Sequence, residues 1–426
     1  MKPLSGVTNL LDKTCRNLAK FFLVLGLAAG FATPFQSLAD EDSLGDAIRQ
    51  GKFIFNGRLR YEDVSNSGFA QDASGLTLRA RVGYKTAAFK GFSFLAEGDF
   101  TRALGVNNFN STVNGKTAFP VIADANSLRL NQLYTTFTGI RDTTVRIGRQ
   151  RVKLDNDRFV GNVGFRQNEQ TFDAALFQTK ALDGFTMTYA YVIQVNRIFG
   201  SKSPAGQLDT NTHLFKVAYD KLPIGALTAF AYFMDVSDAP AASNQTYGIR
   251  LTGGQDLGKG FKGLYELTWA HQKNYKNSPA AFSLDYFQIA GGLSYQGATA
   301  KIGLEVLEGN GSQSFRTPLA TLHAFQGWAD VFLATPASGI EDLYVSLGYK
   351  AAGVPFWGTI SAIVIYHDFS PDTAGPDLGE EVDFKLAVTP EIYQQKVTFS
   401  IEIADFSGSP ILPDVRKLWL TATLAF

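Results

Sequence analysis

The chain contains very few sulfur-bearing residues and has no excess of charge of either sign. Its 426 residues include one cysteine and three methionines. Cys15 lies in a segment that we expect to be removed, so the mature chain is predicted to have neither a disulfide framework nor a reactive thiolate. The 39 basic residues balance the 39 acidic ones, so the composition gives no indication of a nucleic-acid partner.

The amino-terminal segment lacks the length of a membrane-spanning helix. Its apolar run, from Phe21 to Phe35, is about 15 residues, whereas a spanning helix needs about 20. Basic residues precede the run, and Ser37 and Ala39 follow it as small residues at the positions that a signal peptidase recognises. We therefore predict a signal peptide over 1–39, with a membrane anchor as the alternative.

The rest of the chain has no proline-rich or serine-rich linker that would divide it into domains. Hydrophobic residues make up 45% of the sequence and aromatic residues 13%, and both are spread evenly. Length alone suggests two or three soluble domains, but this even composition favours one large all-β domain.

The carboxyl-terminal strand shows which kind of all-β domain this is. Apolar residues alternate with mostly polar or small ones, and the last residue is aromatic. Such alternation is typical of a transmembrane strand, and a terminal phenylalanine suits the assembly signal of outer-membrane barrels. The predicted lipid-facing residues are Leu418, Leu420, Ala422, Leu424 and Phe426.

Similar alternation over about ten residues recurs along the mature chain and predicts an antiparallel transmembrane β-barrel of about 18 strands over 52–426. A short periplasmic segment over 40–51, helix-like from Leu44 to Gln50, precedes it. The expected strands begin near residues 52, 75, 92, 127, 143, 170, 184, 211, 225, 245, 261, 283, 298, 340, 356, 380, 395 and 415.

Long and short connections alternate between these strands, as a barrel with both termini in the periplasm requires. The apolar stretch Phe325 to Leu333 would break this parity as a strand. We place it inside the longest outer loop as a short helix or plug element. Eighteen tilted strands enclose a lumen of roughly 35 Å, which needs inward-folded loops to narrow it. A soluble β-sandwich is the alternative.

Charged residues fall on the inward positions of neighbouring strands. Strand parity predicts a basic wall, while Glu97, Asp99, Glu266, Glu305, Asp383 and Glu402 supply acids. An arginine ladder in a wet pore can select anions, but these charges could instead pair across strands and stiffen the wall. The basic wall comprises Lys417, Arg58, Arg60, Arg79, Arg81, Lys85, Arg129 and Arg146.

The stretch from Gly148 to Asp173 mixes both signs of charge with aromatic residues and glycines, a composition that favours a tightly folded loop. This stretch, together with Phe315 to His323 and Gly327-Trp328-Ala329-Asp330, resembles the alginate export family of outer-membrane porins. The opening from Gly51 to Glu62 is similar to that family too, and the resemblance covers about residues 44 to 426.

The resemblance implies an 18-stranded barrel whose lumen, lined by arginine and a few carboxylates, conducts an anionic uronate polymer. On matching positions, Arg149, Arg151 and Arg158 would supply cationic contacts, and three acids would tie the loop to the wall. These acids are Asp155, Asp157 and Asp173.

Catalytic and metal-binding patterns are missing. The four histidines are scattered without spacing for a metal site. Asp155-Asn156-Asp157 lacks the glycine and glutamate of a calcium loop, and His367-Asp368 alone is weak support for a hydrolase. We expect no cofactor, no bound metal and no enzymatic activity.

The sequence therefore predicts an outer-membrane channel for anionic solutes, with export of an alginate-like polysaccharide implied by the resemblance. The expected partners are an anionic oligosaccharide or polysaccharide, small organic anions, outer-membrane lipid and a periplasmic export protein. Two alternatives stay open: a general diffusion porin with weak selectivity, and a plugged barrel acting in surface structure or adhesion.

Overall fold

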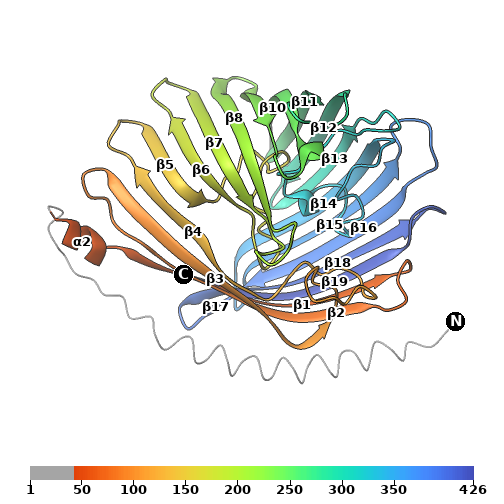
Figure 1. Cartoon of the computed structure of the whole chain (residues 1–426), viewed down its shortest axis with the longest axis horizontal. Coiled ribbons are helices and arrows are strands. Elements are labelled where there is room, and N and C mark those ends of the chain that lie inside the picture. The colour runs from red at the N-terminus through yellow and green to blue at the C-terminus, as the bar shows by residue number, and fades with distance from the viewer. Residues whose placement is uncertain (1–42) are drawn as a thin grey trace. The chain divides into compact units, whose positions relative to one another are not determined.

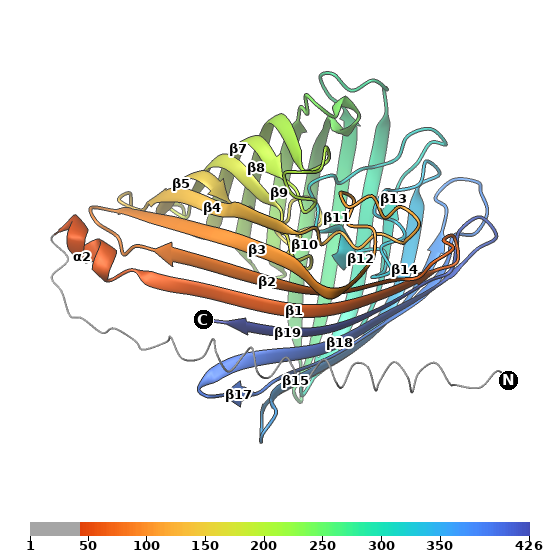
Figure 2. The same ribbon diagram turned by 60° about the horizontal axis from the view of Figure 1, so that its bottom comes forward.

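The computed structural model describes residues 43–426, which form one antiparallel sheet that closes on itself. The predicted signal peptide over 1–39 and the start of the predicted periplasmic segment, 40–42, lie outside the described residues. Eighteen strands follow one another around the barrel in chain order, and the last, β19, pairs with β1 (Figures 1 and 2). The two-residue β17 pairs only with β18 at one turn. The predicted 18-stranded barrel is confirmed.

The strand boundaries agree closely with the alternation in the sequence. The strands are β1 Lys52–Asn66, β2 Ala73–Lys85, β3 Phe92–Asn108, β4 Ser127–Phe137, β5 Thr143–Gln150, β6 Thr171–Thr179, β7 Phe185–Asn196, β8 Gln207–Leu222, β9 Gly225–Met234, β10 Asn244–Gly258, β11 Phe261–Asn274, β12 Ser283–Tyr295, β13 Ala298–Leu307, β14 Ile340–Val354, β15 Gly358–Ser370, β16 Gly379–Thr389, β17 Glu391–Ile392, β18 Gln395–Gly408 and β19 Val415–Ala425.

The two faces of the barrel wall differ in the way that the alternation requires. Leu128 on β4 and Ile147 on β5 project outward and are 81% and 61% exposed, whereas the inward-facing Thr77 and Arg79 on β2 are buried. An apolar outer face suits lipid, and a closed sheet leaves no strand edge with unbonded backbone groups in the membrane.

The connections alternate between two ends of the barrel. We call the end that carries connections 109–126, 151–170 and 308–339 the long-loop end, and the other the short-turn end. Two connections at the long-loop end, 67–72 and 409–414, are short, because β1, β2 and β18 extend far toward that end. The parity of the connections is unchanged.

The helices are short. The helix α2 (Leu44–Arg49) agrees with the predicted helical segment, and the Ser43 side chain accepts a hydrogen bond from its first turn. It lies at the short-turn end beside β2, where the Ala87 amide donates to Ala47 at 2.9 Å (Figure 1). The other helices are the single 3-10 turns η2 (Pro240–Ala242) and η3 (Leu322–Ala324). None of the helices in 43–426 is long and apolar enough to cross a membrane.

The apolar stretch Phe325 to Leu333 lies in the longest connection, as predicted, but it forms no helix. Only η3, just before it, has helical geometry. The stretch folds inside the barrel, where Ala329 and Phe332 are buried in the apolar core described below. Glycine at 327 and the carboxylates on the facing wall favour an irregular backbone over a helix, because amides of the stretch bond to those carboxylates.

The seam between β1 and β19 ends at Phe426. Its amide and carbonyl exchange hydrogen bonds with Phe55 at 3.0 and 2.9 Å, and its ring stacks on that of Phe55 with centroids 5.1 Å apart.

We predict that deleting Phe426 slows barrel assembly, because the closing seam loses its last backbone pair and the chain loses its terminal aromatic residue. The yield of heat-modifiable, membrane-inserted barrel measures this.

The matched control is Phe426→Tyr, which keeps the backbone pair and an aromatic ring and should assemble like the parent chain. Equal yields from the deletion and the parent would contradict the prediction.

Candidate functional site: the narrowed lumen

Two connections fold into the barrel and meet there. We call residues 151–170, between β5 and β6, inner loop 1, and residues 308–339, between β13 and β14, inner loop 2. They join through a parallel bridge between Val160 and Leu319, where the Gly161 amide donates to the Leu319 carbonyl at 2.9 Å. The lumen is therefore narrowed by its own loops, as the predicted barrel width required.

Inner loop 1 crosses the lumen. Near its start, Arg151 pairs with Glu97 on β3 at 2.8 Å. Farther along, Arg158 pairs with Glu305 on β13 at 2.6 Å. Because β3 and β13 lie about half the ring of strands apart, these two contacts hold the loop across the pore.

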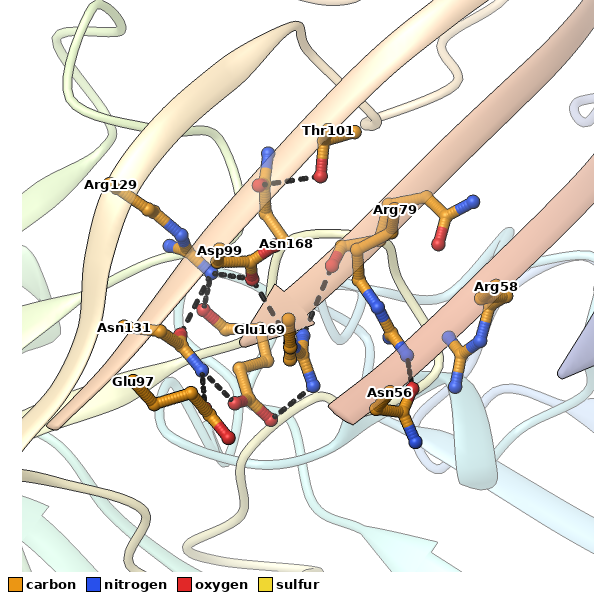
Figure 3. A network of polar contacts seen from close by, with 12 residues as sticks. Asn56, Arg58, Arg79, Glu97, Asp99, Thr101, Arg129, Asn131, Asn168 and Glu169 are labelled. Atoms are coloured by element: carbon orange, nitrogen blue, oxygen red, sulfur yellow. Dashed lines mark hydrogen bonds and ion pairs between the residues drawn. The ribbon is translucent and has the colours of Figure 1, made fainter. Parts of the chain in front are cut away.

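A compact charge network fixes the other end of inner loop 1 (Figure 3). The Glu169 carboxylate, 1% exposed, lies 3.2 Å from Arg81 on β2 and 2.6 Å from Arg151, and it accepts a bond from Asn131. Burial alone would raise the pKa of Glu169, but Arg81 and Arg151 outweigh it and lower that pKa to about 2. The carboxylate thus stays charged and keeps the loop in place.

The same network includes Asp99 on β3. Its carboxylate is fully buried and lies 3.0 Å from Arg81 and 3.5 Å from Arg129 on β4. A β-bulge in β4 lets Asn131 and Gln132 both turn toward Glu97, with Asn131 bonded at 2.6 Å. Two residues of the predicted basic wall, Arg81 and Arg129, are therefore engaged by acids of β3 and inner loop 1.

Inner loop 2 is held by a second acid, Asp330. It pairs with Lys417 on β19 at 2.9 Å, with Arg166 of inner loop 1 at 3.2 Å and with His323 at 2.8 Å. Burial opposes ionisation, but Lys417, His323 and Arg166 together lower the pKa of Asp330 well below its usual range. Arg166 also pairs with Glu62 on β1 at 2.9 Å, so it joins both loops to the wall.

The turn of inner loop 2 rests on two carboxylates of β16. The Trp328 amide donates to Asp383 at 3.1 Å and the Ala329 amide to Glu381 at 2.7 Å. Gly327 has a φ of +78°, and a Cβ there would lie 2.2 Å from the Glu381 carboxylate. Only glycine permits this close approach.

An apolar core fills the space between the loops and the wall. Phe159 of inner loop 1 packs edge-on against Tyr286 of β12 and Phe315 of inner loop 2, and the Phe165 ring stacks on His323 at 3.5 Å. Trp419 on β19 is fully buried in the same cluster. This packing fixes both inner loops against the barrel wall.

Four arginines of the basic wall form no ion pair within the described residues: Arg146 and three that lie together on β1 and β2, namely Arg58, Arg60 and Arg79. Arg58 and Arg79 lie directly opposite each other on β1 and β2. Arg58 donates to the carbonyls of Gly164 and Phe165 at 3.1 and 2.8 Å, Arg60 donates to the same Phe165 carbonyl at 2.7 Å, and Arg79 bonds to Asn56. Two guanidinium nitrogens of Arg79 are buried without a partner in the described part of the chain. We call these three residues the arginine cluster.

The remaining predicted residues divide between lumen and outer face. Arg146 faces inward with its guanidinium 4.8 Å from the centre of the Tyr134 ring. Arg149 pairs with Asp173 at 2.7 Å, but both face outward, because Arg149 lies opposite the 52% exposed Leu133 and two residues from Ile147. The placement of Arg149 and Asp173 in the pore is therefore corrected: β5 continues to Gln150, and alternation turns Arg149 outward.

The two other predicted loop acids have different partners. Asp155 pairs with Lys216 on β8, whereas Asp157 pairs with Lys153 of the same loop at 3.0 Å. The key residues that sequence reasoning missed are Glu169, Arg166 and Asp330. Glu169 and Arg166 stand in the stretch singled out for its mixed charge, and Asp330 stands in one of the stretches that carry the family resemblance, but nothing in the sequence distinguishes the three from their neighbours.

No cluster of three or more potential metal ligands occurs within residues 43–426. Of the histidines outside the apolar core, His271 pairs with Asp285 at 2.7 Å, His213 bonds to Tyr189 at 2.9 Å, and His367 lies 2.8 Å from Asp342 and 3.6 Å from Asp383. The chemistry of the lumen is therefore that of charged and hydrogen-bonding side chains.

We predict that Gly327→Ala displaces the turn of inner loop 2 from β16 and raises the unitary conductance. The added Cβ would overlap the Glu381 carboxylate, beyond the roughly 1–2 kcal/mol that a left-handed alanine costs by itself. Gly311→Ala is the matched control, because Gly311 also has a positive φ in this loop but has nothing within 4 Å of the added atom. Single-channel recordings that show the same change for both variants would refute this role of Gly327.

The position of inner loop 1 should not depend on pH between neutral and mildly acidic conditions. The low pKa of Glu169 means that its stabilising contribution is complete above the ordinary glutamate range near 4 and is lost only as the pH falls through about 2. Channel conductance should therefore stay constant from pH 8 to 4. Glu169→Gln should give larger and noisier conductance across that whole range. If the conductance of the parent channel changed between pH 6 and 4, groups other than Glu169 would control the position of inner loop 1.

Comparison with known proteins agrees with this architecture. The family model described as alginate export matches residues 52–298. Among solved structures, Pseudomonas aeruginosa OpdK with vanillate is 13% identical, with a TM-score of 0.68 over 88% of this chain and 98% of that one. Pseudomonas aeruginosa OpdL is 14% identical, with a TM-score of 0.66 over 89% of this chain and 99% of that one. The comparison with curated proteins gives no match. The chain belongs to the alginate export family of outer-membrane channels, a non-enzymatic family.

Proposed function

We propose that the barrel is an anion-selective channel whose preferred solutes carry carboxylates, with a uronate oligosaccharide or polysaccharide first and small organic acids second. The observation that carries the proposal is the arginine cluster. Arg58 and Arg79 are like charges placed directly opposite each other, an arrangement that is unfavourable unless a counter-charge joins them. Guanidinium groups fork onto carboxylates and stay charged in a partly buried site.

Other arginines in the lumen support this proposal, because they are paired with acids and the arginine cluster is not. Arg81, Arg129, Arg151, Arg158 and Arg166 all have acidic partners within 3.5 Å. Their charges are used in holding inner loop 1. The arginine cluster instead bonds only to carbonyl, amide and hydroxyl oxygens, and none of its three guanidinium groups forms an ion pair within 4 Å in the described residues.

The descriptions of the relatives support this class of solute. A family described as alginate export implies a polymer with one carboxylate on each sugar. The OpdK structure was solved with vanillate, a small aromatic carboxylate. Both are anions that a guanidinium group recognises in the same way, so the cluster fits either.

A plugged barrel is the second candidate, because a buried apolar core occupies part of the lumen. Planar-bilayer recordings separate the two. A channel gives unitary current steps and a reversal potential that favours anions under a salt gradient, whereas a plugged barrel gives no steps.

We predict that the double variant Arg58→Gln and Arg79→Gln lowers anion over cation permeability several-fold. A charge about 7 Å from an ion contributes roughly 0.6–2.4 kcal/mol at an effective dielectric constant of about 80 to 20, and screening by salt is incomplete in a narrow pore. Reversal potentials measure the ratio. Neutral substitutions are used because reversed charges would also attract Arg81 and disturb inner loop 1.

The matched controls are Arg149→Gln, on the outer face of β5, and Arg250→Gln on β10, which pairs with Glu266 at 2.8 Å. Each should change the permeability ratio far less than the double variant. An unchanged ratio in the double variant, with the barrel inserted, would mean that the arginine cluster only braces the wall.

A further inference from the structure

Lysines occupy lumen-facing positions near the short turns on six strands. Each stands an even number of residues from an inward-facing side chain of its own strand, as Lys85 does from Arg79 and Lys301 from Glu305. All six are exposed. We call them the lysine arc: Lys52 on β1, Lys85 on β2, Lys262 on β11, Lys301 on β13, Lys350 on β14 and Lys396 on β18.

The lysine arc follows one side of the barrel mouth. Its strands lie within the continuous run from β11 through β19 to β1 and β2. On the other side, the corresponding positions of β3, β4 and β6 carry the uncharged Ser93, Thr136 and Gln178. The positive charge is therefore concentrated along one wall of the short-turn mouth.

The charges of the lysine arc are not neutralised within the described residues. Lys52 lies directly opposite Lys85 in the β1–β2 register, a like-charge pair. Lys301 faces Gly292 and Ser346 across its two strand pairs. Lys262 and Lys396 lie opposite Asp256 and Glu391 but form no ion pair within 4 Å. By contrast Lys385, deeper in the lumen, pairs with Glu402 at 3.2 Å.

The orientation of these side chains excludes the binding of lipid headgroups, a common role of lysine at a membrane edge. Lysines that bind lipid headgroups project from the outer face of a barrel, as the exposed turn residues Lys90 and Lys180 are free to do. The lysine arc projects into the lumen, where it meets dissolved ions and solutes. For the four lysines with no acid opposite them in the strand registers, a counter-charge would come from a solute in the aqueous mouth.

We infer that the lysine arc captures polyanionic chains such as uronate oligosaccharides and loads the channel from the short-turn end, an inference that rests on the proposed function. A curved row of separated, hydrated ammonium groups suits a flexible chain with a carboxylate on each unit, because each contact is weak and exchangeable. A mouth lined by one sign of charge raises the association rate of the opposite charge 10- to 1,000-fold.

The capture surface makes the two ends of the channel unequal. A carboxylated chain arriving at the short-turn end enters the field of the lysine arc before it reaches the inner loops. The same chain arriving at the long-loop end reaches the inner loops first. Association from the short-turn end should therefore be faster and should depend more steeply on ionic strength.

The test is side-specific block in a planar bilayer. The probe is a linear galacturonate hexamer, with a neutral maltohexaose as the uncharged control. Ala374→Cys, in the exposed connection 371–378 at the long-loop end, marks the orientation of each inserted barrel through a charged thiol reagent, because residues 43–426 contain no other cysteine. The quantity measured is the association rate of blocking events from each side.

The variant Lys52→Gln, Lys85→Gln, Lys301→Gln and Lys350→Gln should lower the hexamer's association rate from the short-turn side about tenfold. The rate from the long-loop side should change less than about twofold. The matched control replaces four exposed basic residues on the short turns by Gln and removes the same charge at the same end. These residues are Lys90, Arg141, Lys180 and Lys259.

Equal reduction from both sides, or an equal effect of the control variant, would overturn the inference. A parent channel that favours anions in reversal-potential measurements but shows no side-dependent block would also overturn it, and would leave the proposed anion channel standing. A parent channel without anion preference would instead refute the proposed function.

Discussion

Closure of the sheet between β1 and β19 is the constraint on which the rest of this structure depends. In a bilayer every backbone amide and carbonyl needs a partner, and a sheet achieves this only when its last strand returns to its first. With eighteen strands, closure produces a lumen too wide for the side chains of the wall to fill. The interior must then be built from the connections, and both inner loops follow from that need.

Bringing two loops into the lumen places many polar groups in a confined space, and ionic pairing is how the chain stabilises them. A buried charge without a partner is strongly destabilising, whereas pairs and networks with good geometry offset the loss of hydration. Glu169, Asp99 and Asp330 each contact two or more cations. Arg58, Arg60 and Arg79 differ from this pattern, because their guanidinium groups bond to neutral oxygens and form no ion pair within the described residues.

The sequence predicts the barrel well because the wall is governed by local rules. Alternation with period two gives each strand, and the parity of connections correctly keeps Phe325 to Leu333 out of the strand count. The interior obeys no such rule. Arg158 and Glu305 are 147 residues apart, and Arg166 and Glu62 are 104 apart. Such partners are set by how loops fold across the lumen. Arg149 shows the limit of predicting where a strand ends: β5 continues through Arg149 to Gln150 where a loop from Gly148 was expected, and strand alternation turns Arg149 outward.

The two kinds of basic residue are divided according to their chemistry. Arginines occupy the crowded interior, where a planar group with five donors can bond to several fixed oxygens, as Arg158 does with Glu305, Thr317 and Gln326. The six lysines of the lysine arc occupy the open short-turn mouth, where a compact, strongly hydrated ammonium group keeps its water, whereas Lys417 is buried in the interior against Asp330. A channel for carboxylated solutes needs both behaviours, because attraction at the mouth must be weak enough to release the solute toward the narrower interior.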